Sequence, residues 1–310
     1  MKFALVFPGQ GSQSVGMLAA YGDAAPMRDT FAEASDALGQ DLWAMVADGP
    51  ADVLNQTVNT QPVMLAAGVA VYRLWQSQGG PAPVLMAGHS LGEYTALVCA
   101  GALGFQDAVK LVRLRAEAMQ SAVPEGIGAM AAVLGLDDAA VRAVCAESAQ
   151  GAVLEAVNFN SPGQVVIAGD KAAVERGCAL AKEKGAKRAL LLPVSVPSHC
   201  ALMKPAAEKL RAAMSAIEVR PPAIAVLHNA DVTSHTDPDA IRDALARQLY
   251  SPVRWVETVQ AMSARGVQLV AECGPGKVLA GLNKRIVEGM LGAAMADAAG
   301  LADTLAKIKA

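Results

Sequence analysis

The chain has 310 residues, 53% of them hydrophobic, which is enough for one large domain or for a large domain with a smaller one. Its 26 basic and 29 acidic residues nearly balance, so the composition does not indicate a protein that binds nucleic acid or an anionic membrane. No apolar run is as long as a membrane span, and the run between Lys2 and Pro8 is too short for a signal peptide. We therefore expect a globular protein of the cytoplasm, with no nucleic-acid or membrane partner.

Strand-like and helix-like segments alternate along the chain. The runs typical of strands are FALVF (3–7), PVLMA (83–87), IAVLHN (224–229) and VQLVAECG (267–274). The segment FQDAVKLVRLRAEAMQ (105–120) is amphipathic and predicts a helix, and the alanine-rich end at 291–310 is expected to be helical or partly frayed. Strands that alternate with helices predict a mainly parallel sheet covered by helices, which is the α/β class.

The middle of the chain, residues 124–195, has a different order of elements. Strands are expected at 128–135, 153–159, 165–169 and 188–194, and helices at 137–149 and 171–185. The resulting βαββαβ order predicts a ferredoxin-like small domain, inserted into a large α/β domain made of residues 1–123 and 196–310. We expect a cleft between the two domains, because ligands often bind at such boundaries.

The five cysteines are scattered along the chain, at positions 99, 145, 178, 200 and 273. Their number is odd and no two of them form a CxxC pair, which argues against both a disulfide framework and a zinc site. We expect reduced thiols and no bound metal.

The stretch GHSLG (88–92) places Ser90 between two glycines, after the strand PVLMA and before the helical run EYTALVCAGAL. A G-x-S-x-G motif in this context is typical of a nucleophile elbow, in which the glycines permit a sharp turn and the serine projects from its apex. We therefore predict that the large domain is α/β-hydrolase-like. The alternative is that the glycines only allow a close crossing of strand and helix, and that Ser90 caps the helix.

A serine nucleophile needs a base that titrates near neutral pH, and this requirement favours histidine. The chain has four histidines. We predict that the base is His199, which follows a turn-favouring Pro-Ser pair where the chain returns to the large domain; the alternative is a packed loop histidine. His228, which follows a predicted strand, is the second choice. His89 is expected to support the turn and His235 to be solvated.

The site also needs a group that orients the histidine and donors that stabilise an oxyanion. No acidic residue is singled out by a local pattern, so a backbone carbonyl is an alternative for the first role. For the second role, the amide of Leu91 follows the nucleophile directly, and Gln10 lies between two glycines in the loop FPGQGSQ. The same loop lacks the GK[ST] ending of a phosphate loop, which makes phosphate binding the weaker interpretation.

Two arginines of the predicted helix 105–120 project from nearly opposite faces. Arg113 lies on a solvated face, whereas Arg115 falls on the apolar stripe that packs inward. A buried guanidinium needs an anion, and an internal salt bridge is one possibility. Because the helix follows the one that begins at Ser90, Arg115 can also reach the cleft. There it would bind a free carboxylate on the acyl group, as a malonyl-type group has.

Several distant segments, taken together, resemble one family. They are FPGQGSQ, NTQP at 59–62, GHSLGE around Ser90, the arginine at 115, NFNSPGQ at 158–164, VPSH ending at His199, RQLYSPVRW at 247–255 and GPGKVL at 274–279. In order and spacing they resemble the malonyl-CoA:acyl carrier protein transacylase family, and in particular the stand-alone bacterial enzymes of fatty acid synthesis. The resemblance covers almost the whole chain.

The resemblance implies a role for each candidate residue. Ser90 is acylated, His199 is its base and Arg115 holds the malonyl carboxylate. The remaining implied roles are the oxyanion hole for Gln10 and the Leu91 amide, orientation of His199 by the backbone carbonyl of Gln248, and lining or support of the cleft for Gln61 and Asn160. Related polyketide acyltransferases often carry HAFH or YASH where this chain has VPSH. Their rule for malonyl against methylmalonyl therefore does not transfer.

The implied reaction is ping-pong: malonyl-CoA acylates the serine, CoA leaves, and the phosphopantetheine thiol of acyl carrier protein attacks the ester. The implied partners are a CoA thioester and the carrier protein, with no cofactor or metal, and we expect a monomer. Carrier proteins of this family are acidic. The cluster of Lys182, Lys184, Lys187 and Arg188 is therefore a candidate docking edge, with an ordinary solvated helix end as the alternative.

Two other functions are consistent with parts of the pattern. A serine esterase or thioesterase would use the same elbow with water as the acceptor, but a hydrolase of neutral esters would not need Arg115. A non-catalytic subunit that binds carrier protein would tolerate loss of Ser90. Substitution of these two residues distinguishes the three interpretations.

Overall fold

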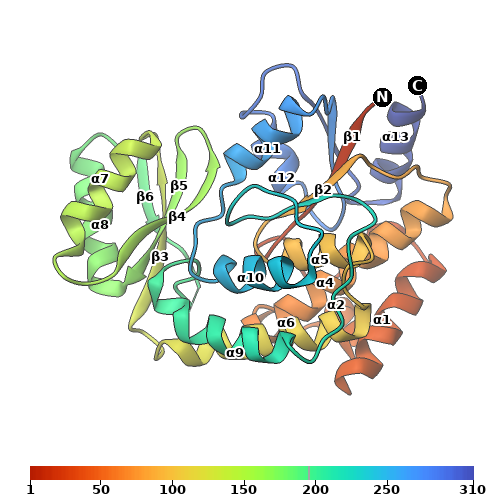
Figure 1. Ribbon diagram of the computed structural model, residues 1–310, viewed down its shortest axis with the longest axis horizontal. Coiled ribbons are helices and arrows are strands. Elements are labelled where there is room, and N and C mark those ends of the chain that lie inside the picture. Colours follow the sequence, from red (N-terminus) through yellow and green to blue (C-terminus); the bar gives the residue numbers. More distant parts are fainter. Residues whose placement is uncertain (195) are drawn as a thin grey trace.

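The computed structural model describes residues 1–194 and 196–310 and shows two sheets of different topology (Figure 1). In the larger sheet the strand order is β7-β2-β1-β8-β9, and all neighbouring strands are parallel. Its strands are β1 (Phe3–Phe7), β2 (Leu85–Gly88), β7 (Val226–Leu227), β8 (Leu269–Glu272) and β9 (Leu291–Ala294). The predicted α/β class with a mainly parallel sheet is therefore confirmed.

Helices cover both faces of this sheet, which explains why β1 is apolar at every position. Phe3, Leu5 and Phe7 belong to one buried core and Ala4 and Val6 to another, as expected for side chains that alternate along a strand. The helices of this unit are α1 (Ala25–Leu38), α2 (Leu42–Asp48), α3 (Ala51–Leu54), α4 (Thr57–Ser77), α5 (Gly92–Cys99), α6 (Phe105–Ala122), α9 (Lys204–Met214), α10 (Pro238–Gln248), α11 (Trp255–Ala264), α12 (Val278–Asn283) and α13 (Ala298–Lys309), with short 3₁₀ helices at Ala19–Tyr21 and Ala201–Met203.

The parallel arrangement brings chemically important loops together. In a parallel sheet the carboxyl ends of neighbouring strands lie at one edge, and ligands of open α/β folds bind there. The strands β7, β2 and β1 are adjacent, so the residues that follow them meet at this edge: His228-Asn229, His89-Ser90 and Pro8-Gly9-Gln10. The sheet order therefore places the predicted nucleophile between two other polar loops.

The smaller sheet consists of antiparallel strands in the order β4-β5-β3-β6, with two helices (Figure 1, left). Its elements are β3 (Gly128–Leu134), α7 (Asp138–Ala149), β4 (Leu154–Ser161), β5 (Gln164–Asp170), α8 (Lys171–Glu183) and β6 (Arg188–Leu191). The order of strands and helices is the βαββαβ order that the sequence predicts. Strand β4 joins the two units, because the N–H of Phe159 donates to Val253 O at 3.0 Å and the N–H of Val253 donates to Val157 O at 2.8 Å.

Three expectations need correction or fall outside the structure. The alanine-rich end is not helical throughout: residues 291–294 form β9, which pairs with β8 as the last strand of the sheet, and only α13 is helical. The expected strand 188–194 ends at Leu191. The predicted domain boundary lies at residue 195, outside the described residues. In the part of the chain that the structure describes, no helix has the length and apolarity that crossing a membrane requires.

Candidate active site

Ser90 lies on a sharp turn between β2 and α5, and its backbone has φ +52°, in the left-handed region. The flanking glycines are required by close packing. A Cβ on Gly88 would lie 1.8 Å from the backbone carbon of Gly92, and a Cβ on Gly92 would lie 2.1 Å from Phe7 O. The close crossing of the alternative interpretation is therefore present, and it leaves the serine on a strained apex. The other part of that alternative is wrong: Ser90 does not cap the helix, because the N-cap residue of α5 is Leu91 and no side chain caps it.

The side chain of His199 connects Ser90 to Gln248. His199 Nε2 lies 2.8 Å from Ser90 Oγ, and Nδ1 lies 2.8 Å from the backbone oxygen of Gln248. A carbonyl oxygen can only accept, so Nδ1 carries the proton and Nε2 is free to accept from the serine hydroxyl. The three groups have the geometry of a nucleophile, a base and an orienting acceptor.

His199 is buried, and its backbone is also in the left-handed region, with φ +68°. Burial, and next the positive charge of Arg115, lower its pKa from 6.5 to about 3. The imidazole is therefore neutral at physiological pH, the form that a general base needs. Strained backbone at both partners of the Ser90–His199 pair is typical of functional sites.

The other three histidines do not contact the serine hydroxyl. His89 Nε2 lies 2.8 Å from Asn160 Oδ1, so it supports the turn as expected. The second choice for the base, His228, is wrong, because this histidine is fully buried and its Nδ1 lies 2.7 Å from Glu93 Oε1. The sequence predicts a solvated His235, but its side chain is only 23% exposed and pairs with Asp231.

Arg115 lies inside the protein, only 1% exposed, on the inward face of α6. Its NH2 group donates to Ser90 Oγ at 3.3 Å and to Gln248 Oε1 at 3.1 Å, and its NH1 group donates to Gln61 Oε1 at 2.8 Å. In residues 1–194 and 196–310 no carboxylate lies within ion-pair distance of this guanidinium, so the salt-bridge alternative is wrong. Burial lowers the pKa of Arg115 from its ordinary value.

The predicted oxyanion donors lie beside the nucleophile. Leu91 is the N-cap residue of α5, so its amide lies at the helix N-terminus, where N–H groups have no acceptor within the helix. The loop with Gln10 packs closely against the nucleophile turn, since a Cβ on Gly9 would lie 2.6 Å from His89 O. The side-chain oxygen of Gln10 accepts from Gln61 Nε2 at 3.4 Å, which links this loop to the Arg115 site.

Two adjoining cavities lead from the surface to the serine. The inner one, about 150 Å³, is lined by Ser90, His199 and His89 among others. The outer one, about 910 Å³, is lined by both polar and apolar side chains. Four residues line both cavities: Gln10, Thr57, Leu192 and Val194. Because the first two come from the larger unit and the last two follow β6, the passage lies between the units.

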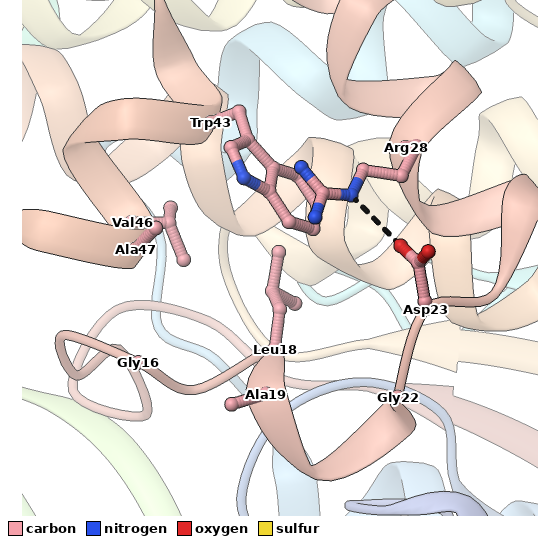
Figure 2. A pocket seen from close by; sticks show the side chains of 9 residues that line it. All are labelled: Gly16, Leu18, Ala19, Gly22, Asp23, Arg28, Trp43, Val46 and Ala47. Atoms are coloured by element: carbon pink, nitrogen blue, oxygen red, sulfur yellow. Dashed lines mark hydrogen bonds and ion pairs between the residues drawn. The ribbon is translucent and has the colours of Figure 1, made fainter.

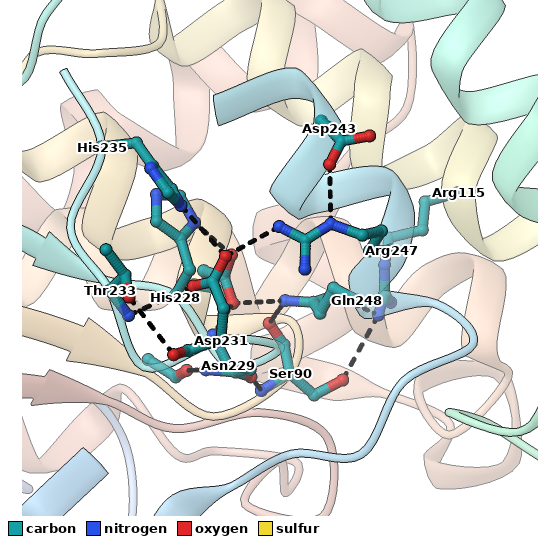
Figure 3. A network of polar contacts seen from close by, with 12 residues as sticks. Ser90, Arg115, His228, Asn229, Asp231, Thr233, His235, Asp243, Arg247 and Gln248 are labelled. Carbon is teal, nitrogen blue, oxygen red and sulfur yellow. Dashed lines mark hydrogen bonds and ion pairs between the residues drawn. The ribbon is translucent and has the colours of Figure 1, made fainter. Parts of the chain in front are cut away.

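A polar network behind the serine contains groups that the sequence analysis did not find (Figure 3). The side chain of Asn229 accepts from Ser90 N–H and donates to Gly88 O, both at 2.7 Å. Glu93 is fully buried, and its carboxylate accepts from the Asn229 N–H and from Gln248 Nε2, both at 2.8 Å. These bonds fix the nucleophile turn from behind.

The basic cluster lies on the smaller unit. Lys182 and Lys184 are at the end of α8, Lys187 and Arg188 lead into β6, and all four are exposed. Lys184 pairs with Glu147 at 2.7 Å. Leu192 in the cavity wall follows Arg188 by four positions of extended chain, about 13 Å.

A further pocket, about 300 Å³, lies at α1 and α2, away from these groups (Figure 2). The Arg28 guanidinium lies 4.1 Å from the centroid of the Trp43 ring and pairs with Asp23 at 3.3 Å. Its lining contains no serine or histidine, so it provides no nucleophile or base. Among the described residues no group of three or more His, Cys, Asp or Glu side chains could hold a metal ion.

Comparison with known proteins gives full-length matches. Residues 4–303 match the family described as acyl transferase domain. The malonyl CoA-acyl carrier protein transacylase of Escherichia coli K12 is 59% identical over 305 residues, 98% of this chain and 99% of the relative. A crystal structure of the acyl-carrier-protein S-malonyltransferase from Burkholderia pseudomallei is 62% identical, with a TM-score of 0.97 over 99% of this chain and 100% of the other. A solved complex, described as a type II PKS acyl-carrier protein with its malonyl-transacylase, is 56% identical, with a TM-score of 0.98 over the same shares.

Proposed function

The chain belongs to the acyl transferase domain family, and we propose that it transfers a malonyl group from malonyl-CoA to the phosphopantetheine thiol of acyl carrier protein. It is an acyltransferase of fatty acid synthesis. The observation that carries the substrate assignment is Arg115, a buried guanidinium without a carboxylate partner in the described part of the chain, 3.3 Å from Ser90 Oγ. A planar guanidinium binds a carboxylate through two parallel hydrogen bonds, which suits the free end of a malonyl group.

The first half-reaction acylates Ser90. As its oxygen attacks the thioester carbonyl, the hydroxyl proton passes to Nε2 of His199. The new oxyanion accepts hydrogen bonds from the backbone N–H groups of Leu91 and Gln10. When the tetrahedral intermediate collapses, the carbon–sulfur bond breaks and His199 returns the proton to the CoA sulfur. The products are malonyl-serine and free CoA.

The second half-reaction reverses these roles. The phosphopantetheine thiol gives its proton to His199 and attacks the ester, and the proton then returns to Ser90 Oγ as the carbon–oxygen bond breaks. This sequence requires no cofactor or metal, which remains a proposal. The long pantetheine arm would enter through the two adjoining cavities, whose shared lining lies between the units.

The basic cluster is our candidate for the edge that docks the carrier protein, with Lys187 and Arg188 closest along the chain to Leu192 in the cavity wall. Reversing the charge of both residues to glutamate should raise the Michaelis constant for carrier protein and leave that for malonyl-CoA unchanged. Lys309→Glu, on α13 of the larger unit and outside the lining of both cavities, is the control and should change neither constant. Equal effects on both substrates, or no effect, would reject the docking edge.

We also propose a fold type for each of the two units. The turn at Ser90 after a parallel strand supports an α/β-hydrolase-like large domain of residues 1–123 and 196–310. The element order of residues 124–195 and the sheet order β4-β5-β3-β6 support a ferredoxin-like small domain. The monomeric state and the cytoplasmic location stay predictions.

Intact-protein mass spectrometry tests the function directly. After brief mixing with malonyl-CoA, the wild type should gain one malonyl-sized adduct, and addition of holo acyl carrier protein should move that mass to the carrier. Ser90→Ala should gain none. Release of free malonate, or cleavage of simple esters without an adduct, would instead support the serine esterase or thioesterase alternative.

A further inference from the structure

The buried charge of Arg115 requires compensation. An uncompensated cation in the interior is strongly unfavourable. Yet among the described residues the guanidinium hydrogen-bonds only to neutral groups, which are the amides of Gln61 and Gln248 and the hydroxyl of Ser90. It also lies 5.4 Å from the centroid of the Tyr94 ring, a contact that stabilises a cation but supplies no counter-charge. Its Nε, also buried, has no hydrogen-bond partner among the described residues. The anion that balances this charge must therefore act through another group.

The side-chain amide of Gln248 connects Arg115 to such an anion. Its Oε1 accepts from the Arg115 NH2 group at 3.1 Å, while its Nε2 donates to Glu93 Oε2 at 2.8 Å. An amide that accepts from a cation at one end and donates to an anion at the other is polarised by both, which strengthens both hydrogen bonds. Gln248 thus joins the two charges in series.

Glu93 has the features of a counter-charge. It is fully buried in the first turn of α5, and besides Gln248 its oxygens accept from the Asn229 backbone N–H at 2.8 Å and from His228 Nδ1 at 2.7 Å. No lysine or arginine lies within ion-pair distance of it in residues 1–194 and 196–310. Arg115 and Glu93 are therefore a buried cation and a buried anion, each without a direct partner of fixed opposite charge.

We propose that Glu93 is the counter-charge of Arg115, reached through the side-chain amide of Gln248, and that this relay holds the guanidinium from behind while its front stays open to the substrate carboxylate. The statement that the guanidinium stays open to a substrate carboxylate rests on the proposed function. A direct Arg–Glu pair would occupy two N–H groups of the guanidinium with a bidentate contact and so compete with the substrate. The indirect connection involves neutral acceptors only, and the described residues accept from three of the five N–H donors of the guanidinium.

The relay also fixes the nucleophile turn. Gln248 Nε2 donates to the backbone oxygen of Ser90 at 2.9 Å as well as to Glu93, and the Asn229 residue held by Glu93 accepts from the Ser90 N–H. The acyl-carboxylate site and the nucleophile are thus tied to one buried carboxylate. Glu93 and the Gln248 side chain are positioning groups, because neither reacts itself.

A double-mutant cycle on stability tests the charge pairing. Glu93→Gln should lower the Tm of the wild type clearly, because it leaves a buried cation unbalanced, and should lower the Tm of Arg115→Met by less than half as much. Glu272→Gln is the matched control, since Glu272 is a buried acid at the end of β8 with no contact to Arg115. Its shift in Tm should be the same in both backgrounds. Equal shifts for Glu93→Gln in the two backgrounds would overturn the pairing.

Substrate discrimination tests the positioning role. Gln248→Met keeps the backbone carbonyl that orients His199 and removes only the amide. The ratio of Ser90 acylation rates with malonyl-CoA and acetyl-CoA should fall about tenfold, because only the malonyl group uses Arg115. A loss of equal size for both thioesters, or no loss, would overturn this part.

These readouts separate the relay from the function on which it rests. If the wild type itself forms no malonyl adduct, the proposed function fails, while the stability cycle still decides whether Glu93 compensates Arg115. If Glu93→Gln does not fold, its Tm cannot be compared, and the cycle is run with Gln248→Met and Arg115→Met instead. Additive shifts of Tm in that cycle would equally overturn the relay.

Discussion

The side-chain oxygen of Asn229 accepts the backbone N–H of Ser90 at 2.7 Å, although the two residues are 139 positions apart in the sequence. The bond is possible because β7 and β2 are neighbours, so the residues that follow them lie at the same edge of the sheet. The Asn229 amide also donates to Gly88 O, and together the two bonds hold both sides of a turn with positive φ.

Loss of these two bonds should slow acylation. Asn229→Ala should reduce the rate of malonyl-serine formation about 10- to 100-fold, because the nucleophile turn relaxes, with little change in the Michaelis constant for malonyl-CoA. Rapid-quench mass spectrometry measures the rate. Asn229→Asp keeps the acceptor for the Ser90 N–H but places a second carboxylate oxygen against Gly88 O, where two acceptors repel each other, so it should be at least as slow as Asn229→Ala. Full activity of either variant would contradict the role of this residue.

Removal of the guanidinium should abolish selectivity for a charged acyl group. Arg115→Met should lower kcat/KM for malonyl-CoA at least about 100-fold, because losing one partner of a desolvated charge pair costs about 3 kcal/mol or more. Arg115→Lys keeps the charge but not the two-pronged geometry, and its kcat/KM should fall between those of Arg115→Met and the wild type. Unchanged selectivity against acetyl-CoA in Arg115→Met would disprove the assignment.

The low pKa of His199 predicts an unusual pH dependence. Burial and the charge of Arg115 lower the pKa to about 3, so the base should remain neutral and the acylation rate should show no acid limb near pH 6.5. Because the folded-state pKa lies below the unfolded value, His199 contributes stability above pH 6.5 that is lost as the pH falls toward 3. Titration of the C2 proton resonance by NMR checks the value, and a midpoint near 6.5 would refute it.

The contribution of Glu272 to stability should change with pH in the opposite direction to that of His199. Burial raises its pKa from 4.5 to about 7, so the folded state binds the proton more tightly than the unfolded chain. The stabilisation is complete below pH 4.5 and is lost as the pH rises through 7, by about 3 kcal/mol in total. Glu272→Gln carries no titrating proton, so its Tm relative to wild type should rise between pH 5 and pH 8. A difference in Tm that does not vary with pH would contradict the shift.

The parts of the site that could be predicted are those with a local signal. Ser90 lies in a motif whose glycines and flanking elements are contiguous, and Arg115 stands out as a charge on an apolar stripe. His199 is distinguished as the candidate base by its position where the chain returns from the inserted unit. The strands of the larger sheet also have a local signal, because parallel strands that are covered on both faces are short apolar runs.

Asn229 and Glu93 were missed because their roles depend on which strands are neighbours. A signal was present for each: Asn229 directly follows a predicted strand, and Glu93 is a single acid in an otherwise apolar helix start. The role of the Gln248 carbonyl came only through the family resemblance, because a backbone atom leaves no trace in residue type. The strand at 291–294 was missed because its alanine-rich composition favours a helix in isolation.

The contacts within the site span long distances along the chain: 109 residues separate Ser90 from His199, and 158 separate Ser90 from Gln248. During synthesis, the nucleophile turn leaves the ribosome long before the segments that supply its base, the base's acceptor and the anchor of Arg115. A nascent chain that ends before α10 therefore contains the serine but not a working site. The site is therefore complete only after the segment that contains Gln248 has been made, and we expect shorter chains to be inactive toward the thioester.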